Sequence, residues 1–353
     1  MKKYWGVVAS LALFQLMHTA SADTLKPLDS DREPDRIEWS QLGAKLGPLP
    51  KPKAGTRIGA VAKTMTNEYW RLLGEGYKAG GSKNGVQVDV QAAQSEGDQL
   101  GQLAIAENML TRGYAELLLS PQTDANLRPV LGEAAKTNVP IINVNDAVIP
   151  SAEHYIGNVQ RDNGVRAARW YIQNRPAGGK VAVIEGMAGV YAAVQRTDGF
   201  KSTLSKESTK FTVVASVPGN WDRQTSYDAA TNIVQQHPDL VGIYCNNDTM
   251  ALGVVEAVKA AGKLNQIAVI GTDGTSDAYK SILAGELTGT VDSFPVLTGE
   301  VAVETALRVL GGQKVPRVVA TPQALVTKAN YARYKTGGED AQRKALIEDS
   351  TKQ

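Results

Sequence analysis

Short apolar runs alternate with segments of helical periodicity from residue 57 to about residue 310. Apolar runs of four or five residues are typical of buried β-strands, and apolar residues spaced three or four apart are typical of amphipathic helices. In the first half the predicted strands are 58–62, 86–90, 115–119 and 140–144, and the predicted helices are 68–83, 99–112 and 125–137. This alternation predicts βαβ units, and therefore a mostly parallel sheet with right-handed crossovers.

The same alternation then starts again. The predicted helices of the second half are 165–174, 195–204, 226–236, 250–261, 276–283 and 299–310, and the predicted strands are 180–184, 211–215, 241–244, 267–270 and 287–291. From 318 onward we expect irregular or extended chain. Two similar halves predict an α/β fold in which two doubly wound parallel-sheet lobes face a cleft.

The first residues have the pattern of an export signal. Lys2 and Lys3 precede an apolar run over 4–17, and Ala20-Ser21-Ala22 provides the small residues of a cleavage site. We therefore expect a signal peptide over 1–22 and a periplasmic mature protein. No later apolar stretch is long enough to cross a bilayer.

Residues 23–55 are charged and rich in proline, and they carry too little apolar surface to fold alone. Ile37, Trp39 and Leu42 are the apolar anchors of this N-terminal extension. We expect the extension to lie over the body of the protein.

Composition and motifs exclude several classes of function. The chain has 353 residues, 42% of them hydrophobic and 21% charged, and a net charge of +2, so nothing favours nucleic-acid binding. Neither a dinucleotide fingerprint nor a P-loop is present, and no metal or nucleophile motif occurs, so we expect no cofactor and no enzymatic activity. His154 and His237 are expected in solvated loops, and Cys245, the only cysteine, is expected to be a buried, inert thiol.

Polar and aromatic residues gather where the predicted strands end. One strand ends in Asn246-Asn247-Asp248 just before a helix, and ligands of open parallel sheets bind at the carboxyl ends of strands. Such side chains could instead only cap helices, the aromatic pair after the first strand could be core anchors, and Arg196 with Asp273 could form a structural ion pair. The candidate ligand-binding residues are Asn67, Tyr69, Trp70, Asn145, Asp146, Arg196, Trp221, Asn247, Asp273 and Ser293.

Three motifs carry a resemblance to a known family. Asn246–Gly253, Gly271–Asp277 and Gly186–Gly189 with Arg196–Phe200 resemble the ribose/galactose-type periplasmic sugar-binding proteins, and the likeness covers about residues 57–328. The resemblance implies the type I periplasmic binding protein fold, in which two lobes joined by three crossovers close on one sugar. It also implies that the closed form docks onto a membrane permease or a chemoreceptor.

The resemblance also implies a domain plan. The chain should cross between the lobes near Gln160, Phe294 and Thr321. The first lobe is then expected over 56–160 plus 294–321, the second over 161–293 plus 322–335, and a C-terminal tail over 336–353.

By position, Asn67, Tyr69 and Trp70 match the first-lobe ligand contacts of that family, and Arg196, Trp221, Asn247 and Asp273 match the second-lobe contacts. This chain departs from the ribose pattern in carrying Asn145-Asp146 where ribose-binding proteins carry Asp-Arg. It also has Ser293 in place of a hinge glutamine, and Tyr69-Trp70 in place of Phe-Phe.

The exchange at Asp146 changes the charge expected at the ligand site. Arg196 alone among the matched contacts would oppose Asp146 and Asp273. The ligand would then supply either hydroxyl donors or a positive charge, and anionic ligands should bind poorly.

Two functions follow from the resemblance. The first is a monomeric solute-binding protein that delivers a sugar or polyol to an ATP-binding-cassette permease. The alternative is a periplasmic sensory protein that presents ligand occupancy to a histidine kinase ectodomain or a chemoreceptor. The second is suggested by similarity to the periplasmic partner of the trimethylamine-oxide sensor kinase and to the autoinducer-2 receptor, which also carry an N-terminal extension.

Overall fold

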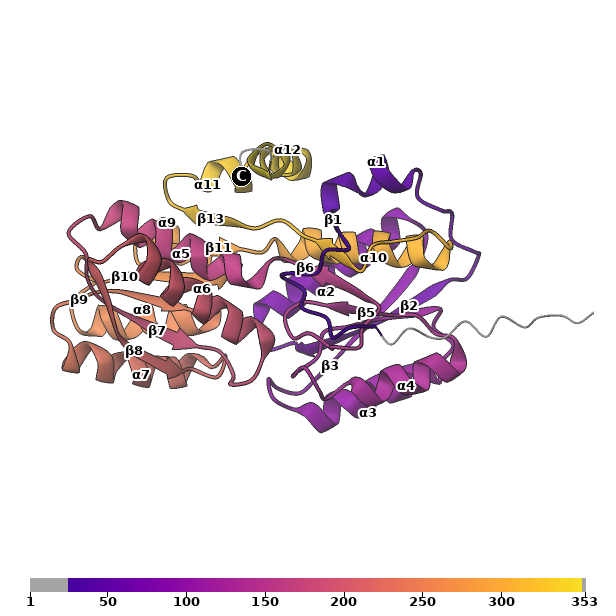
Figure 1. Ribbon diagram of the computed structural model, residues 1–353, viewed down its shortest axis with the longest axis horizontal. Helices are drawn as coiled ribbons and strands as arrows, with labels where there is room; N and C mark the ends of the chain where they lie inside the picture. Colours follow the sequence, from indigo (N-terminus) through magenta and orange to yellow (C-terminus); the bar gives the residue numbers. More distant parts are fainter. Residues whose placement is uncertain (1–24, 351–353) are drawn as a thin grey trace, which may run out of the picture.

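The computed structural model describes residues 25–350, which form two lobes, each built around one β-sheet (Figure 1). The expected signal peptide lies outside the described residues. No helix between residues 25 and 350 is both long and apolar enough to cross a membrane.

The sheet of the first lobe has the order β1-β12-β6-β5-β4-β2-β3, and all of its neighbouring strands run parallel. Its strands are β1 (Arg36–Glu38), β2 (Arg57–Thr64), β3 (Gln87–Ala93), β4 (Glu116–Leu119), β5 (Ile141–Val144), β6 (His154–Gly157) and β12 (Val318–Ala320). Helices cover both faces: α2 (Glu68–Lys83) and α10 (Pro295–Leu310) pack on one, and α3 (Gln99–Leu110) and α4 (Arg128–Thr137) on the other.

The sheet of the second lobe has the order β13-β11-β10-β9-β7-β8, with β13 antiparallel to β11 and the other pairs parallel. Its strands are β7 (Gly179–Glu185), β8 (Phe211–Pro218), β9 (Leu240–Cys245), β10 (Ala268–Asp273), β11 (Gly289–Asp292) and β13 (Ala324–Thr327). The helices α5 (Gln160–Asn174) and α6 (Tyr191–Glu207) cover one face. The other face is covered by α7 (Arg223–Gln236), α8 (Asp248–Ala260) and α9 (Ser276–Ala284).

The chain passes between the lobes three times, after β6, after β11 and after β12. At the second passage Phe294 has φ +48°, a left-handed conformation that is costly for a bulky residue. The predicted α/β fold of two doubly wound lobes is confirmed. Parallel strands bury apolar residues on both faces of a sheet, and helices therefore cover both faces in each lobe.

The N-terminal extension is part of the first lobe's packing. Its strand β1 pairs with β12, and the short helices η1 (Trp39–Gln41) and α1 (Leu42–Leu46) follow. Ile37, Trp39 and Leu42, the three predicted anchors, are all buried. The extension therefore uses the core of the lobe to obtain the apolar contacts that it lacks by itself.

The structure corrects the prediction of irregular or extended chain from 318 onward. Besides β12 and β13 this region contains α11 (Tyr331–Lys335) and α12 (Gly338–Ser350). The guanidinium of Arg343 in α12 pairs with Glu300 of α10 and lies 5.6 Å from the ring of Trp39. These tertiary contacts stabilise a helix whose own apolar residues are few.

Two residues singled out by type also have defined places. His154, expected in a solvated loop, belongs to β6 and is half-buried, because its strand is inserted between β5 and β12. Cys245 is fully buried at the end of β9, as predicted, and burial raises the pKa of its thiol.

Candidate ligand-binding cleft

A small cavity lies where the carboxyl ends of the two sheets face each other. Its lining from the first lobe is Asn67, Tyr69, Trp70, Glu96 and Asp146, and from the second lobe Arg196, Trp221, Asn247 and Asp273. Its free volume is only about 10 Å³. A small organic ligand would therefore need the lobes to separate before it could enter.

Two of the lining residues also cap helices. The side chain of Asn67 accepts a hydrogen bond from Tyr69 N at the start of α2 (3.0 Å), and that of Asn247 accepts one from Met250 N at the start of α8 (2.9 Å). Capping was considered from the sequence for Asn247 but not for Asn67, and the structure shows a cap at both. Capping fixes these side chains at the edge of the cavity, so it does not exclude contact with a ligand.

The aromatic walls come from both lobes. Tyr69 and Trp70 pack edge to face with their ring centres 4.8 Å apart, and Trp70 Nε1 donates to Glu96 Oε1 at 2.8 Å. Trp221 has φ +63°, in a left-handed turn that costs a residue with Cβ about 1 kcal/mol or more. A Cβ at Gly186 would lie 2.0 Å from the Trp221 ring, so the indole needs a glycine there.

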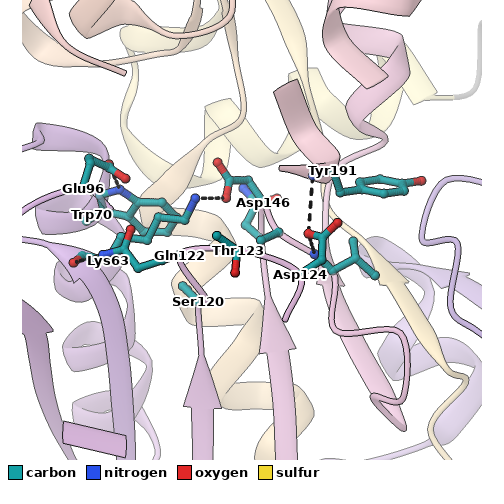
Figure 2. A network of polar contacts seen from close by, with 12 residues as sticks. Lys63, Trp70, Glu96, Ser120, Gln122, Thr123, Asp124, Asp146 and Tyr191 are labelled. Carbon is teal, nitrogen blue, oxygen red and sulfur yellow. Dashed lines mark hydrogen bonds and ion pairs between the residues drawn. The ribbon is translucent and has the colours of Figure 1, made fainter. Parts of the chain in front are cut away.

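A buried ion pair lies beneath the aromatic residues of the first lobe. Lys63, near the end of β2, has its Nζ 2.6 Å from Asp146 Oδ1, and both side chains are nearly inaccessible to solvent. The same Nζ lies 5.5 Å from the centre of the Trp70 ring and 5.8 Å from that of Trp221. Figure 2 shows Lys63 directed at Asp146, with the hydrogen-bonded pair of Trp70 and Glu96 beside the lysine.

This pair corrects the expected charge balance, in which Arg196 alone opposed the two aspartates. Lys63 neutralises Asp146, so the first lobe keeps a cation although the position after β5 carries a carboxylate. Sequence reasoning left Lys63 and Glu96 out of the candidate site. A lysine at the end of an otherwise apolar strand was the available signal for Lys63, whereas Glu96 lies in a loop without a distinctive pattern.

In the second lobe Arg196 is held from two sides. Its Nε donates to Gln160 Oε1 at 2.9 Å and its guanidinium donates to the carbonyl of Asn246 at 2.6 Å. The distance to Asp273 Oδ1 is 3.8 Å, so the structural ion pair considered from sequence is a loose one. Burial, with Asp248 nearby, raises the pKa of Asp273 well above its usual range despite Arg196.

Two of the predicted site residues, Asn145 and Ser293, lie behind the lining. Asn145 is fully buried, donates to the hydroxyl of Tyr69 and accepts from Gln160 Nε2 at 2.7 Å. Ser293 is also fully buried, and its backbone N–H donates to the carbonyl of Asp273 at 3.1 Å. Both therefore contact residues of the lining rather than the cavity.

The cleft thus combines aromatic faces with two cations and three carboxylates. Burial raises the pKa of Glu96, an effect that the nearby Lys63 opposes. Within the described part of the chain, no group of three or more His, Cys, Asp or Glu side chains could hold a metal ion. The lining therefore offers hydrogen-bond acceptors and donors together with three aromatic rings.

Comparison with known proteins agrees with this architecture. A protein family described as periplasmic binding protein domain matches residues 58–314. The D-allose-binding periplasmic protein of Escherichia coli is 34% identical over 290 residues, which covers 78% of this chain and 93% of that protein. A ribose import binding protein of Bacillus subtilis is 30% identical and covers 93% of this chain and all of its own length.

A solved structure is similar over the whole of its own chain. The periplasmic solute-binding protein of an ABC transporter from Actinobacillus succinogenes, with bound D-allose, superposes with a TM-score of 0.76 at 27% identity and covers 79% of this chain. The family match spans most of the chain, and the solved structure has a similar overall fold. The chain therefore belongs to the family of periplasmic binding proteins.

Proposed function

We propose that this protein captures a neutral sugar or polyol between its lobes in the periplasm and delivers it to the permease of an ATP-binding-cassette importer. The observation that carries the proposal is the interlobe cavity, where one indole ring from each lobe lies within 6 Å of the buried ammonium of Lys63. Aromatic faces suit the C–H surfaces of a sugar ring, and carboxylates and amides accept hydrogen bonds from hydroxyls. Relatives that bind D-allose and ribose support the ligand class.

The position of Lys63 favours hydroxyl groups over a positively charged ligand. Its ammonium already lies against Trp70 and Trp221, where an alkylammonium group would have to stack. Anionic ligands are disfavoured because the cleft already holds three carboxyl groups, and burial raises the pKa of two of them, Glu96 and Asp273, so the site resists further negative charge. A neutral polyhydroxylated ligand satisfies both conditions.

Delivery requires the lobes to open and close. The cavity is too small for a ligand to enter, and three crossings with a strained Phe294 provide a hinge. We expect saturating ligand to compact the protein in small-angle scattering. Identical curves with and without ligand would contradict this mechanism.

The ligand class is tested by thermal unfolding with a panel of D-allose, D-ribose, myo-inositol, an amino sugar and a sugar acid. Ligand at 100 times its dissociation constant stabilises the folded state by about 2.7 kcal/mol, so a neutral sugar should raise the melting temperature most. A largest shift with the sugar acid would contradict the proposed electrostatics. Recovery of the bound sugar unchanged, measured by NMR after long incubation, would support binding without catalysis.

The location and partner need separate tests. Cell fractionation should find the protein in the periplasm, and light scattering should give the mass of a monomer. Sugar uptake by permease-containing vesicles should depend on the added protein. Stimulation of a histidine kinase ectodomain without any effect on uptake would favour the sensory alternative.

A further inference from the structure

The helix α5 is capped by a residue from a distant part of the chain. It begins at Gln160, and the residue before it, Val159, has no side chain that can accept a hydrogen bond. Instead Asp31 binds the first free amides: Gln160 N lies 2.9 Å from Oδ1 and Arg161 N lies 2.7 Å from Oδ2. A carboxylate at a helix start satisfies free N–H groups and interacts favourably with the helix dipole.

The segment that carries Asp31 contacts both lobes. On the first lobe Glu33 pairs with the buried Arg317 at 3.0 Å. On the second lobe the hydroxyl of Tyr191, at the start of α6, donates to Asp29 at 2.5 Å and accepts from Asp31 N at 3.1 Å. In Figure 1 this indigo segment, just before β1, lies at the junction of the lobes. The extension therefore holds Asp31 in place from two directions.

The residue that Asp31 fixes reaches into the cleft from behind. Gln160 Oε1 accepts from Arg196 Nε at 2.9 Å, and Gln160 Nε2 donates to Asn145 Oδ1 at 2.7 Å. Asn145 in turn donates to the hydroxyl of Tyr69. Tyr69 of the first lobe and Arg196 of the second both line the cavity. One buried glutamine thus joins the polar groups of both lobes, and its backbone is tied to the extension.

We propose that Asp31 is a positioning residue for the cleft: by capping α5 it fixes Gln160, which orients Arg196 toward the ligand. The inference rests on the proposed function only for its effect on ligand affinity. Residue 31 lies outside 58–314, the region that the family match covers, so the extension adds a support to the ligand site that the matched domain does not include.

The positioning claim is tested first without any ligand. Asp31→Ala and Asp31→Asn are compared with Arg32→Ala, a control in the same turn whose guanidinium lies no closer than 4.0 Å to Asp29. Measurements are made at pH 7.5, because burial raises the pKa of Asp31 only to about 6 and the carboxylate is then ionised. NMR measures exchange of the Arg196 Nε–H with water. We expect faster exchange in Asp31→Ala, a partial effect in Asp31→Asn, which keeps one acceptor, and none in Arg32→Ala.

The second test is a double-mutant cycle on affinity for D-allose, measured by calorimetry. Losing a helix cap should weaken binding about 2- to 30-fold in Asp31→Ala. Because Asp31 acts through Gln160, the same change in a Gln160→Leu background should have little further effect. Additive losses would overturn the proposal, since Asp31 would then act on the fold in general.

The two tests separate the failure of each proposal. If wild-type protein binds no sugar of the panel, the proposed ligand class is wrong, while exchange of the Arg196 proton still decides the positioning role. Unchanged Arg196 exchange in both Asp31 variants overturns the positioning role even if sugars bind. If Asp31→Ala does not fold, the comparison of Asp31→Asn with Arg32→Ala gives the same decision.

Discussion

Glu116 is a buried carboxyl group that should make the protein less stable as the pH rises. It lies in β4 with no exposed surface, and neither carboxylate oxygen has a hydrogen-bond partner within residues 25–350. Glu116 pairs with Ile58 in the register of β4 and β2, and its side chain points to the same face of the sheet as that of Leu118. Both Ile58 and Leu118 belong to the apolar core on that face. Burial therefore raises the pKa of Glu116 well above its usual range.

The sign of the pH effect follows from this shift. Because burial raises the pKa of Glu116 in the folded state, the contribution of the protonated side chain to stability is fully present below the unfolded-state pKa of about 4.3. That contribution is lost as the pH rises toward the folded-state pKa. Over that range folding must take up one proton. Each pH unit then lowers the free energy of unfolding by about 1.4 kcal/mol.

The replacement Glu116→Met removes the polar group and keeps a similar volume. At low pH it should raise the free energy of unfolding by about 1–3 kcal/mol, the cost of a buried polar group without a partner. Above pH 4.3 the stability gained by Glu116→Met over the wild-type protein should grow by about 1.4 kcal/mol per pH unit until the folded-state pKa is reached. Urea unfolding of both proteins between pH 4.5 and 8 measures the difference at each pH.

Glu107→Met is the matched control, because Glu107 is exposed on α3. It should change stability little, because it lies on the surface. An advantage of Glu116→Met that stays constant or shrinks as the pH rises would refute the reasoning, because it would mean that the folded protein stabilises the ionised carboxylate.

Three further substitutions test the cleft. Glu68 of the first lobe accepts hydrogen bonds from the amides of Ser276 and Asp277 at the start of α9 in the second lobe (3.1 and 3.4 Å). Glu68→Ala should therefore speed sugar dissociation about two- to fivefold in stopped-flow measurements. Glu75→Ala, on the same helix, should leave the dissociation rate unchanged. Lys63→Met leaves the buried carboxylate of Asp146 unpaired and should lower the free energy of unfolding by about 3–5 kcal/mol in urea titrations. An unchanged urea midpoint would argue against the Lys63–Asp146 ion pair. Asp273→Asn should weaken sugar binding by about 1–3 kcal/mol in calorimetry with the fold retained, and equal affinity would remove Asp273 from the site.

The arrangement of the lobes and much of the lining could be predicted from the sequence. Alternating strand and helix patterns imply parallel sheets, and parallel strands bring their carboxyl ends to one edge. Residues at or just beyond the carboxyl ends of strands, such as Asn247 and Asp273, can therefore be assigned to the cleft without knowing which strands are neighbours. The strands β4 and β5 have only four residues but were predicted, because each contains an apolar run. The strand β6 begins with His154 and ends with Gly157, and β12 has only three residues, so neither stood out as such a run.

Only the tertiary structure decided which distant groups meet. Lys63 and Asp146 pair because β2 and β5 are separated by one strand, β4, and hydrophobic patterns carry no information about that lateral order. The cap of α5 by Asp31 depends on the path of the extension, and the isolation of Glu116 depends on what packs around it. Local patterns set the periodicity of each element, whereas the partners of a buried charge are set by contacts between elements far apart along the chain.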